Sequence, residues 1–353
     1  MKVILFNDTG NSCHAGCQAV SDAHARLLGA AGHSVIHREF VLHHRKHWTG
    51  DADSAIKSVL SDDSLVKKIS AADAVIVNGE GTLHHNRGYH LLAILGAAQE
   101  LGKPTLLVNA VFQETAGFDE VLRRLIDFTV RDNRSLQHAK DRDLPCRLVW
   151  DSSLAAEYSP MPLKDFKDKA LVTDWHLERA DDVGRTMLSY LSAEPDNSFF
   201  LPFLTEAAFS LWRRFPATMA TANVIISGRH HGNYFAIKSG TPFVCLPSNT
   251  FKVEGLVDML GEQVPVVKDI KSLRDGIEYV TARPEMFKRI QAKVKEQHPL
   301  STFSELGKGQ DSDVPTELKR LKKDLTKARR VMRKRHIAPF IAADRVLKAA
   351  LLN

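Results

Sequence analysis

Short apolar segments alternate with amphipathic segments from the first residue to about Trp150. The runs Lys2–Asn7, Ala74–Asn78 and Thr105–Asn109 have the length and apolar content of buried strands. The stretches between such runs, for example Tyr89–Leu101, have the apolar spacing of helices. Strands that alternate with helices of about 10–15 residues indicate βαβ units and a parallel sheet. The other strands predicted here are Ser34–Arg38, Phe128–Arg131 and Arg147–Trp150, and the other helices are Ala19–Ala30, Phe118–Ile126 and Arg134–Lys140.

The alternation pauses at Tyr158–Pro162, where proline and serine indicate a linker, and then restarts. The second set of elements implies a second Rossmann-like half, and such folds bind ligands at the carboxyl ends of their strands. From Pro284 the pattern is helical. The strands predicted in this half are Ala170–Thr173, Phe199–Pro202, Val224–Ser227 and Pro242–Leu246. The helices are Asp182–Leu191, Glu206–Arg213, Gly232–Lys238, Phe251–Leu260 and Leu273–Val280.

The chain of 353 residues is longer than the roughly 250–300 residues at which single hydrophobic cores stop growing. We therefore predict an α/β protein with two Rossmann-like, doubly wound domains. The predicted domains are residues 1–157, on the acceptor side, and 163–298, on the donor side. A flexible linker at 299–315 and a basic, amphipathic helical tail at 316–353 follow them.

Positive charge is concentrated at the end of the chain. Residues 315–353 contain twelve Lys or Arg and three acidic residues, a net charge of +9, whereas the whole chain carries +6. Leu318, Leu321 and Leu325 fall on one face of the predicted helix. A basic amphipathic helix of this kind lies in a membrane interface and is attracted to anionic lipids. A solvated or coiled-coil helix is the alternative. Nucleic acid is disfavoured, because the tail lacks aromatic stacking residues and a known reading motif.

The sequence pattern contains no transmembrane or secretion signal. No stretch approaches the roughly 18–20 consecutive apolar residues that a transmembrane helix needs. The first apolar run is interrupted at Asn7, so it indicates a strand rather than a signal peptide. We therefore expect a cytoplasmic protein that is attached peripherally to the inner membrane through residues 316–353.

Cys13 and Cys17 flank His14, an arrangement that invites a zinc interpretation. A structural zinc site needs about four ligands, and no second close pair of Cys or His follows at ligand spacing. Free thiols are therefore the favoured interpretation. Because neither a DxD motif nor a ligand cluster stands out, we predict no metal and no cofactor.

The first candidate site is segment 7–20, which leaves the first strand and enters the first helix. Its glycines and small polar residues suit a turn whose free N–H groups and helix dipole attract an anion or a carbohydrate. The spacing is not GxGxxG, so a dinucleotide site is not predicted. An ordinary turn is the alternative. The candidate acceptor- or sugar-binding residues here are Asn11, His14 and Gly16.

The second candidate site, residues 77–86, directly follows an apolar strand. Glycines on both sides of Glu80 let a ligand approach closely. Glu80 is a candidate catalytic acid, base or nucleophile. The alternative is a carboxylate that caps the next helix. The candidate acceptor- or sugar-binding residues around it are Gly79, Gly81, Thr82, His84 and His85.

The third candidate site opens a predicted helix at residues 227–233. Arg229 offers two parallel hydrogen bonds to phosphate or carboxylate, and His231 can donate to the same anion or move a proton. The helix N-terminus adds to the attraction. Solvent-exposed histidines are the alternative. The candidate donor-binding residues are Ser227, Arg229, His230, His231, Gly232 and Asn233, and His231 is also a candidate catalytic residue.

Two further polar clusters are predicted to be mainly structural. Arg131 ends a strand and is a candidate acceptor-binding residue, but a salt bridge to Asp132 beside a Ser or Asn helix cap is favoured. The loop His43–Trp48 is rich in His, Lys and Arg. We interpret it as a solvated loop, with contact to an anionic acceptor as the alternative.

These motifs, in this order, resemble those of the polysaccharide pyruvyl transferase superfamily over about residues 3–260. The strand that ends at Asn78 looks like the family's strand before a glycine cluster, and Arg131 begins a segment like its R-D-x-x-S. Ser227-x-Arg229-x-His231 looks like the family's S-x-R-x-H, and Gly240-x-Pro242 looks like the following G-x-P. The resemblance implies a GT-B-like fold with donor contacts from Arg229 and His231.

The resemblance also implies an activity: transfer of a pyruvyl group from phosphoenolpyruvate to a sugar of a bacterial surface polysaccharide, with a lipid-linked or growing glycan as acceptor. Glu80 departs from the family, which usually has glycine there. A carboxylate suits glycosyl transfer from a UDP- or CMP-sugar onto an O-antigen or capsule glycan, so a nucleotide-sugar donor is the alternative. A glycan-binding scaffold without catalysis is a third interpretation.

Overall fold

The structure is a computed structural model that describes residues 1–41, 43–47, 50–297, 301–307, 323–330 and 351. Contacts between residues divide the chain into two compact units. Unit 1 comprises Met1–Ser12, Ser21–Ser152 and Leu300–Val331, and unit 2 comprises Cys13–Val20, Ser153–Pro299 and Met332–Asn353. Each unit is therefore assembled from separate segments of the chain.

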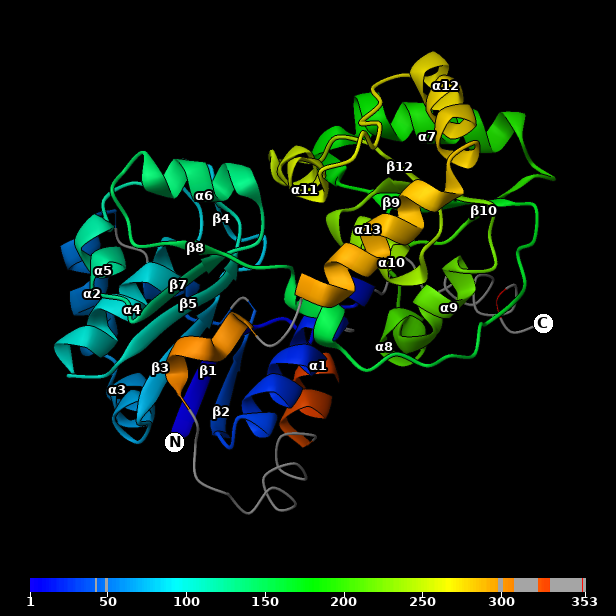
Figure 1. Cartoon of the computed structure of the whole chain (residues 1–353). Coiled ribbons are helices and arrows are strands. Elements are labelled where there is room, and N and C mark those ends of the chain that lie inside the picture. The colour runs from blue at the N-terminus through cyan, green and yellow to red at the C-terminus, as the bar shows by residue number, and fades with distance from the viewer. Residues whose placement is uncertain (42, 48–49, 298–300, 308–322, 331–350, 352–353) are drawn as a thin grey trace. The chain divides into compact units, whose positions relative to one another are not determined.

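Unit 1 contains a parallel sheet of six strands in the order β2-β1-β3-β5-β7-β8 (Figure 1). The strands are β1 (Lys2–Asp8), β2 (Ser34–Phe40), β3 (Ala74–Asn78), β5 (Thr105–Ala110), β7 (Asp127–Val130) and β8 (Arg147–Leu148). In the register of the sheet, Val3 lies opposite Val35 on one side and Ala74 on the other. A separate short parallel pair consists of β4 (Leu83–His84) and β6 (Phe112–Gln113).

The helices of unit 1 lie between successive strands. They are α2 (Ala52–Leu60), α3 (Asp63–Ser70), α4 (Tyr89–Glu100), α5 (Asp119–Arg123) and α6 (Asn133–Lys140), with short 3₁₀ turns η1 (Arg45–His47) and η2 (Ser152–Ala155). Helix α1 (Ala15–Ala30) begins in unit 2 and continues in unit 1. Asp51, Asp62 and Asp132 cap α2, α3 and α6 by accepting a backbone N–H, the usual role of Asp at this position.

The core of unit 1 surrounds its central strands. β3 and β5 are buried at every residue, as expected for parallel strands that are covered on both faces. Residues Leu91–Leu95 of α4 are also fully buried, and Phe112 packs edge-on against Phe128 at 5.3 Å between ring centroids. This packing leaves the carboxyl ends of β1, β3 and β5 to carry polar side chains.

Unit 2 contains a parallel sheet of four strands in the order β10-β9-β11-β12. The strands are β9 (Ala170–Trp175), β10 (Ser198–Phe200), β11 (Val224–Gly228) and β12 (Phe243–Cys245). The α-helices are α7 (Arg185–Ala193), α8 (Ala208–Leu211), α9 (Phe215–Met219), α10 (His230–Ser239), α11 (Lys252–Leu260), α12 (Ile270–Thr281) and α13 (Pro284–Gln297). Short turns complete it: η3 (Leu177–Arg179), the π-helical η4 (Ala180–Gly184) and η5 (Trp212–Arg214).

The prediction of two α/β halves with parallel sheets is confirmed, and the fold is of the Rossmann-like GT-B type. Each predicted strand is present within a few residues. The pattern missed α2 and α3, because their exposed faces are polar and their apolar positions are few. The helix predicted over Glu206–Arg213 is shorter: α8 ends at Leu211 and η5 follows as a 3₁₀ turn.

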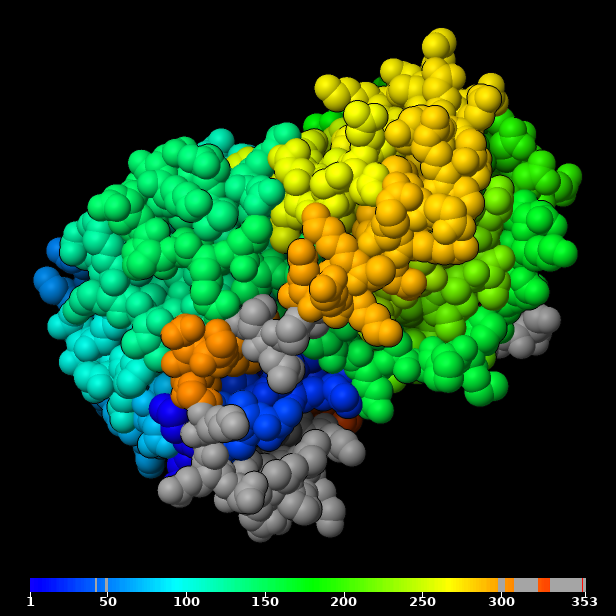
Figure 2. Space-filling view, viewed as in Figure 1, coloured from blue at the N-terminus to red at the C-terminus, as the bar shows by residue number. Residues whose placement is uncertain are grey.

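The linker predicted at 299–315 is wrong for residues 301–306, which form the 3₁₀ segment η6 (Ser301–Leu306). Phe303 is buried and packs edge-on against His24 at 5.3 Å between ring centroids. Burial of this ring and of Leu306 holds the segment against β5 and β7. Figure 2 shows η6 in orange on the surface of unit 1. The rest of the predicted linker lies outside the described residues, apart from Gly307.

Of the predicted basic tail, residues 323–330 are described and are helical. Leu325 is half-buried, and the Nε of Arg329 donates to the carbonyl of Gly10 at 3.1 Å. This stretch therefore contacts unit 1. The rest of the tail, including Leu318 and Leu321, lies outside the described residues, apart from Leu351. None of the helices in the described ranges is long and apolar enough to cross a membrane.

Candidate functional site

Three neighbouring strands of unit 1 end in polar residues with a left-handed backbone. Asn7 at the end of β1 has φ 55°, Glu80 after β3 has φ 37°, and Asn109 in β5 has φ 57°. Such conformations cost free energy in residues other than glycine and concentrate at ligand sites. The carboxyl ends of parallel strands are also where α/β folds bind ligands. These three residues therefore define the candidate site of unit 1. Of them, Glu80 was predicted from the sequence as a site residue, Asn7 lies in the predicted segment 7–20, and Asn109 was missed.

A hydrogen-bond network ties β1 to the glycine segment. The Nδ2 of Asn7 donates to the carbonyl of Asn78 at 2.7 Å and to the Oγ1 of Thr82 at 3.2 Å. The Nδ2 of Asn78 returns a bond to the carbonyl of Asn7 at 3.3 Å. The Oδ1 atoms of Asn11 and Asn78 and the Nδ2 of Asn109 are buried without a partner among the described residues. Buried polar atoms are nearly always hydrogen-bonded, so these three mark places for water or a ligand.

Glu80 is buried between two glycines that hold the backbone against its neighbours. A Cβ on Gly79 would lie 2.4 Å from the Cβ of Ala110, so no side chain fits there. The carbonyl of Glu80 accepts the N–H of Val111 at 2.6 Å. Glu80 does not cap α4, because the residue before that helix is Gly88 and no side chain caps it. The structure therefore does not support the helix-cap interpretation of Glu80.

His84 and His85 follow the glycine segment and lie against each other. Their Nδ1 atoms are 2.9 Å apart and their rings meet edge to face at 5.0 Å between centroids. The Nε2 of His85 lies 3.5 Å from a carboxylate oxygen of Glu114. The pairing of β4 with β6 holds His84 opposite Gln113, so both histidines sit in a defined framework rather than in a free loop.

Arg131 is fully buried beneath the glycine segment. Its Nη2 lies 3.6 Å from where a Cβ of Gly81 would stand. The predicted salt bridge to Asp132 is wrong: Arg131 pairs with Asp151. Asp132 instead caps α6, accepting the N–H and the hydroxyl of Ser135 at 2.8 and 2.7 Å. Burial raises the pKa of the Asp132 carboxyl despite these hydrogen bonds.

Two buried groups at this edge, Asp8 and His24, are not among the site residues predicted from the sequence, although Asp8 lies in segment 7–20. Asp8 pairs with Arg38; burial alone would raise the pKa of Asp8, but Arg38 and the hydrogen bonds from Arg38, Ser21 and Gly10 lower it. The Nε2 of His24 lies 3.0 Å from the hydroxyl of Ser152. Burial lowers the pKa of His24 to about 4. In the sequence, the polar residue at the end of each apolar run is the feature that marks this edge of the sheet.

In unit 2, β11 delivers Ser227 and Arg229 to the N-terminus of α10. The Nε and Nη2 of Arg229 donate to one carboxylate oxygen of Asp174 on β9, at 2.8 and 2.5 Å. The other oxygen of Asp174 accepts the N–H of Phe203 at 2.7 Å. Asp174 thus fixes the guanidinium at the carboxyl end of the sheet. It was missed from the sequence, although it is an acidic residue at the end of an apolar strand.

Ser227 and Gly232 shape the start of α10. The hydroxyl of Ser227 donates to the carbonyl of Arg229 at 2.9 Å. A Cβ on Gly232 would lie 2.3 Å from the Oγ of Ser227, so glycine is required for this close approach. Asn233 is fully buried, and both polar atoms of its amide lack a hydrogen-bond partner among the described residues. The alternative of solvent-exposed histidines is not supported, because His230 and His231 are both buried.

The second half of the first loop belongs to this site in unit 2. A Cβ on Gly16 would lie 2.1 Å from the Cγ of His231. The rings of His14 and His231 are 5.5 Å apart between centroids, and the Nδ1 of His14 accepts the N–H of Gly16 at 3.2 Å. The structure therefore brings His14 and Gly16 together with the predicted donor residue His231, whereas Asn11 stays with unit 1.

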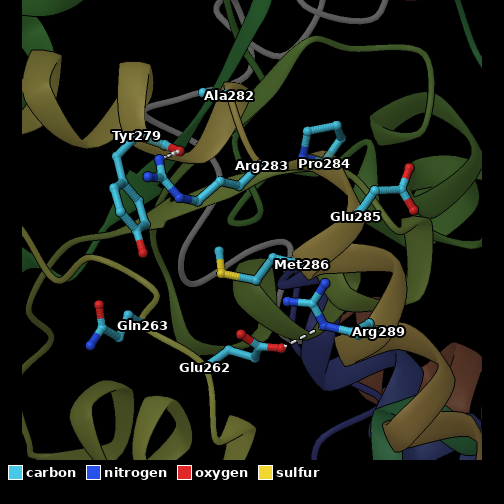
Figure 3. Close-up of a pocket in the computed structure, with 9 residues that line it drawn as sticks. All are labelled: Glu262, Gln263, Tyr279, Ala282, Arg283, Pro284, Glu285, Met286 and Arg289. Atoms are coloured by element: carbon cyan, nitrogen blue, oxygen red, sulfur yellow. Dashed lines mark hydrogen bonds and ion pairs between the residues drawn. The ribbon is translucent and has the colours of Figure 1, made fainter.

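Neither a cysteine-based metal site nor the cavity among the last helices of unit 2 is a candidate for the chemistry. The four cysteines are free thiols, and within the described residues Cys13, His14 and Cys17 do not converge with a further metal ligand. A cavity of about 500 Å³ lies where α11, α12 and α13 meet (Figure 3). Its charged groups are already paired: Arg289 with Glu262 at 2.9 Å, and Arg283 over the ring of Tyr279.

The chain matches a family model in sequence and solved structures in fold. The family model described as polysaccharide pyruvyl transferase matches residues 14–250. MnaA of S. aureus, solved with UDP, superposes with a TM-score of 0.56 at 12% identity over 86% of this chain and 94% of its own. The UDP-GlcNAc 2-epimerase of Neisseria meningitidis, bound to UDP-GlcNAc, gives a TM-score of 0.50 at 12% identity over 93% and 100%.

The UDP-GlcNAc 2-epimerase of Methanocaldococcus jannaschii, in complex with UDP-GlcNAc and UDP, gives a TM-score of 0.50 at 12% identity over 84% of this chain and 100% of its own. A search of the curated proteins finds no match. At these identities the structures share the fold alone. The family model spans well over half of the chain and includes the S-x-R-x-H motif at Ser227–His231. The chain is a transferase and belongs to the polysaccharide pyruvyl transferase family.

Proposed function

We propose that this transferase moves a pyruvyl group from phosphoenolpyruvate to a sugar of a bacterial surface polysaccharide. The observation that carries the proposal is the N-terminus of α10, where Arg229 and His231 stand at the carboxyl end of β11. Free N–H groups and the helix dipole attract an anion at such a point. Phosphoenolpyruvate presents two anionic groups, a phosphate and a carboxylate.

Arg229 is the proposed clamp for one of these groups. Asp174 occupies its Nε and Nη2, and no hydrogen bond from its Nη1 is found in the part of the chain that the structure describes. A guanidinium that is held on one side is preorganised to bind an anion on the other. The buried amide of Asn233, one turn into α10, adds hydrogen-bonding capacity to the same region.

The proposed reaction forms a ketal. A proton is added to C3 of phosphoenolpyruvate, which becomes the methyl group, and one sugar hydroxyl bonds to C2. The bond from C2 to the phosphate oxygen then breaks, and a second hydroxyl of the sugar bonds to C2. Of the two hydroxyl protons, one balances the proton given to C3 and the other leaves with inorganic phosphate. His231 is the proposed proton donor to C3, a role that suits imidazole near neutral pH.

Unit 1 supplies the proposed acceptor site. Sugars are recognised by directional hydrogen bonds, and the unpartnered amide atoms of Asn11, Asn78 and Asn109 offer donors and acceptors for them. Glu80 is the proposed base that takes a proton from an acceptor hydroxyl. Its left-handed backbone fits a residue that is held for chemistry rather than for stability.

Glycosyl transfer from a nucleotide sugar is the second candidate. It is favoured by one observation: MnaA and the two epimerases of the same fold were solved with UDP or UDP-GlcNAc. In that case Arg229 and His231 bind the phosphates of a UDP- or CMP-sugar, and the first loop with Glu80 holds the acceptor or donor sugar.

Thermal unfolding with added ligands separates the two candidates. A ligand that binds only the folded chain raises its melting temperature by mass action. We expect phosphoenolpyruvate to raise it for the wild type and not for Arg229→Ala, and UDP and CMP to leave it unchanged. The control Arg283→Ala, in the cavity of Figure 3, keeps the response. A shift with UDP or CMP and none with phosphoenolpyruvate would replace the proposal with the second candidate.

We also propose that residues 316–353 attach the enzyme to an anionic membrane surface. Support comes from the twelve basic and three acidic residues of 315–353, since each Lys or Arg near anionic lipids contributes about 1 kcal/mol. Full-length protein is expected to sediment with liposomes that contain phosphatidylserine and not with neutral liposomes. Equal binding of a chain that ends at residue 315 would overturn the attachment.

A further inference from the structure

Glu39, His43 and His44 bring three ligand atoms together at the end of β2. The Oε2 of Glu39 lies 3.0 Å from the Nε2 of His44 and 3.4 Å from the Nδ1 of His43. All three atoms lie within 4.8 Å of one another. No other group of three His, Cys, Asp or Glu side chains with this spacing occurs among the residues that the structure describes.

The spacing matches that of ligands around one metal ion. Zinc binds imidazole nitrogen and carboxylate oxygen at about 2.0–2.2 Å, so two ligands on a tetrahedral ion stand about 3.3 Å apart. The separations of 3.0 and 3.4 Å from the carboxylate lie on either side of this value. His43 is half-exposed, with 50% of its side chain accessible.

Neighbouring residues already orient two of the ligands. The Nζ of Lys68 on α3 donates to the Oε1 of Glu39 at 2.6 Å, which leaves Oε2 directed toward the histidines. The ring of His44 packs edge-on against Phe6 of β1 at 5.7 Å between centroids, and His44 has a left-handed backbone with φ 66°. Outer contacts of this kind fix ligand orientation in metal sites. A strained backbone is retained where the surroundings require that conformation.

The solvated loop predicted from the sequence is confirmed for the exposed residues His43, Arg45 and Lys46 and is wrong for His47. Residues 45–47 form η1, and His47 is buried against the hydroxyl of Ser58 at 3.1 Å and near Asp62 at 3.4 Å. Trp48 lies outside the described residues. The loop packs because aromatic and imidazole rings bury against one another: His44 stacks on His47 at 6.1 Å between centroids.

We propose that Glu39, His43 and His44 bind one divalent transition-metal ion of the zinc class. Two imidazoles and a carboxylate suit zinc, and three protein ligands leave one position open for water or a hydroxyl. The site stands at the carboxyl edge of the sheet of unit 1, since Phe40 pairs with Asp8 in the register of β1 and β2. An ion there supplies a positive charge beside the acceptor site. The proposal does not depend on the identity of the donor.

The experiment uses the full-length chain without a purification tag. Zinc is titrated in competition with a chromophoric chelator, and cobalt is added in parallel to record its visible absorption. We expect one zinc ion per chain and a cobalt spectrum that reports nitrogen and oxygen ligands. Loss of one ligand in His43→Gln or His44→Gln is expected to weaken zinc binding by about 100-fold or more, beyond the roughly 10–100-fold effect of outer contacts.

His176→Gln is the matched control, because His176 lies on the loop after β9 in unit 2 and takes no part in the cluster. It is expected to bind zinc as the wild type does. If His44→Gln fails to fold by circular dichroism, the half-exposed His43 still provides the test. Equal zinc affinity of the wild type and His43→Gln, or less than one ion per wild-type chain, would show that the three side chains form only a hydrogen-bonded cluster.

Discussion

The carboxyl edges of the two sheets present different chemical groups. In unit 1 the edge consists of strained Asn and Glu residues and buried amide atoms without partners. In unit 2 it consists of a helix N-terminus, a guanidinium held by Asp174 and two neighbouring histidines, His14 and His231, whose rings are tilted against each other. The first set matches a ligand rich in hydroxyl groups, and the second matches an anion. One fold used twice has therefore produced two chemically distinct surfaces, and the proposed acceptor and donor follow this division.

The largest expected effect is on turnover at the edge of unit 1. Glu80→Gln keeps the size of the side chain and one acceptor oxygen but removes its basicity. General acid–base groups contribute about 10²–10⁴-fold, so we expect kcat to fall by that factor with little change in the binding of acceptor. Steady-state kinetics on the wild type, on Glu80→Gln and on the exposed control Glu285→Gln make this comparison. Unchanged kcat in Glu80→Gln would remove Glu80 from the chemistry.

The next effect concerns donor binding at the edge of unit 2. Arg229→Ala removes the guanidinium that Asp174 orients and leaves that carboxylate, which is only 14% exposed, without its partner. Charge-assisted hydrogen bonds contribute about 1.5–3 kcal/mol each, so kcat/KM for the donor is expected to fall by roughly 10–100-fold or more. The double variant Asp174→Asn with Arg229→Ala tests whether the two act as one unit. If the losses in kcat/KM of the two single variants simply add in the double variant, Asp174 does not position Arg229.

A third prediction concerns stability against pH in unit 1. His24 has a folded pKa of about 4 against 6.5 for the free side chain, because it is buried. The unfolded chain takes up the proton more readily, so the stability that neutral His24 contributes is complete above pH 6.5 and is lost as the pH falls toward 4. The loss reaches about 3 kcal/mol. Urea unfolding between pH 7 and 4 is expected to show a shallower decline for His24→Gln. Parallel curves for the two proteins would contradict the assignment.

The smallest expected effect concerns stability and tests the close contact between Gly16 of the first loop and His231. Gly16→Ala places a Cβ 2.1 Å from the Cγ of His231, and overpacking of this kind destabilises by about 1–3 kcal/mol. Gly29→Ala in the same helix meets nothing within 4 Å, and alanine there is expected to stabilise by about 0.5–1 kcal/mol. Urea midpoints of the two variants are therefore expected to move in opposite directions. Movement in the same direction would mean that Gly16 is not closely packed.

The sequence supported the fold well because parallel strands buried on both faces are continuous apolar runs. Ala74–Asn78 was predicted with the bounds that β3 has in the structure. Helices such as α3 were missed because their stability comes from Asp62 at the N-cap and from Leu65 and Ile69, the only fully buried apolar positions of α3. Local composition does not show that a mainly polar stretch packs in this way.

The candidate sites were predictable in part. Polar residues at strand ends identified Glu80 and Arg229, since that position follows from the alternation of strand and helix. Their partners were not predictable: Asp151 is twenty residues from Arg131 and Asp174 is fifty-five from Arg229. Pairing at such separations is decided by strand order in the sheet, which a single sequence does not display. The same reason explains why Arg131 was assigned to the neighbouring Asp132.

The division of α1 between the units has a consequence for the order of synthesis. Residues 13–20 leave the ribosome among the first, yet the residues that they pack against, including Phe203 and His231, are made much later. Unit 2 therefore cannot complete its packing while the early chain is being made. A gene fragment that covers only 153–299 encodes unit 2 without two of its three segments, one of which is Cys13–Val20. Adding residues 13–20 as a separate peptide to this fragment tests by complementation whether the fragment depends on them.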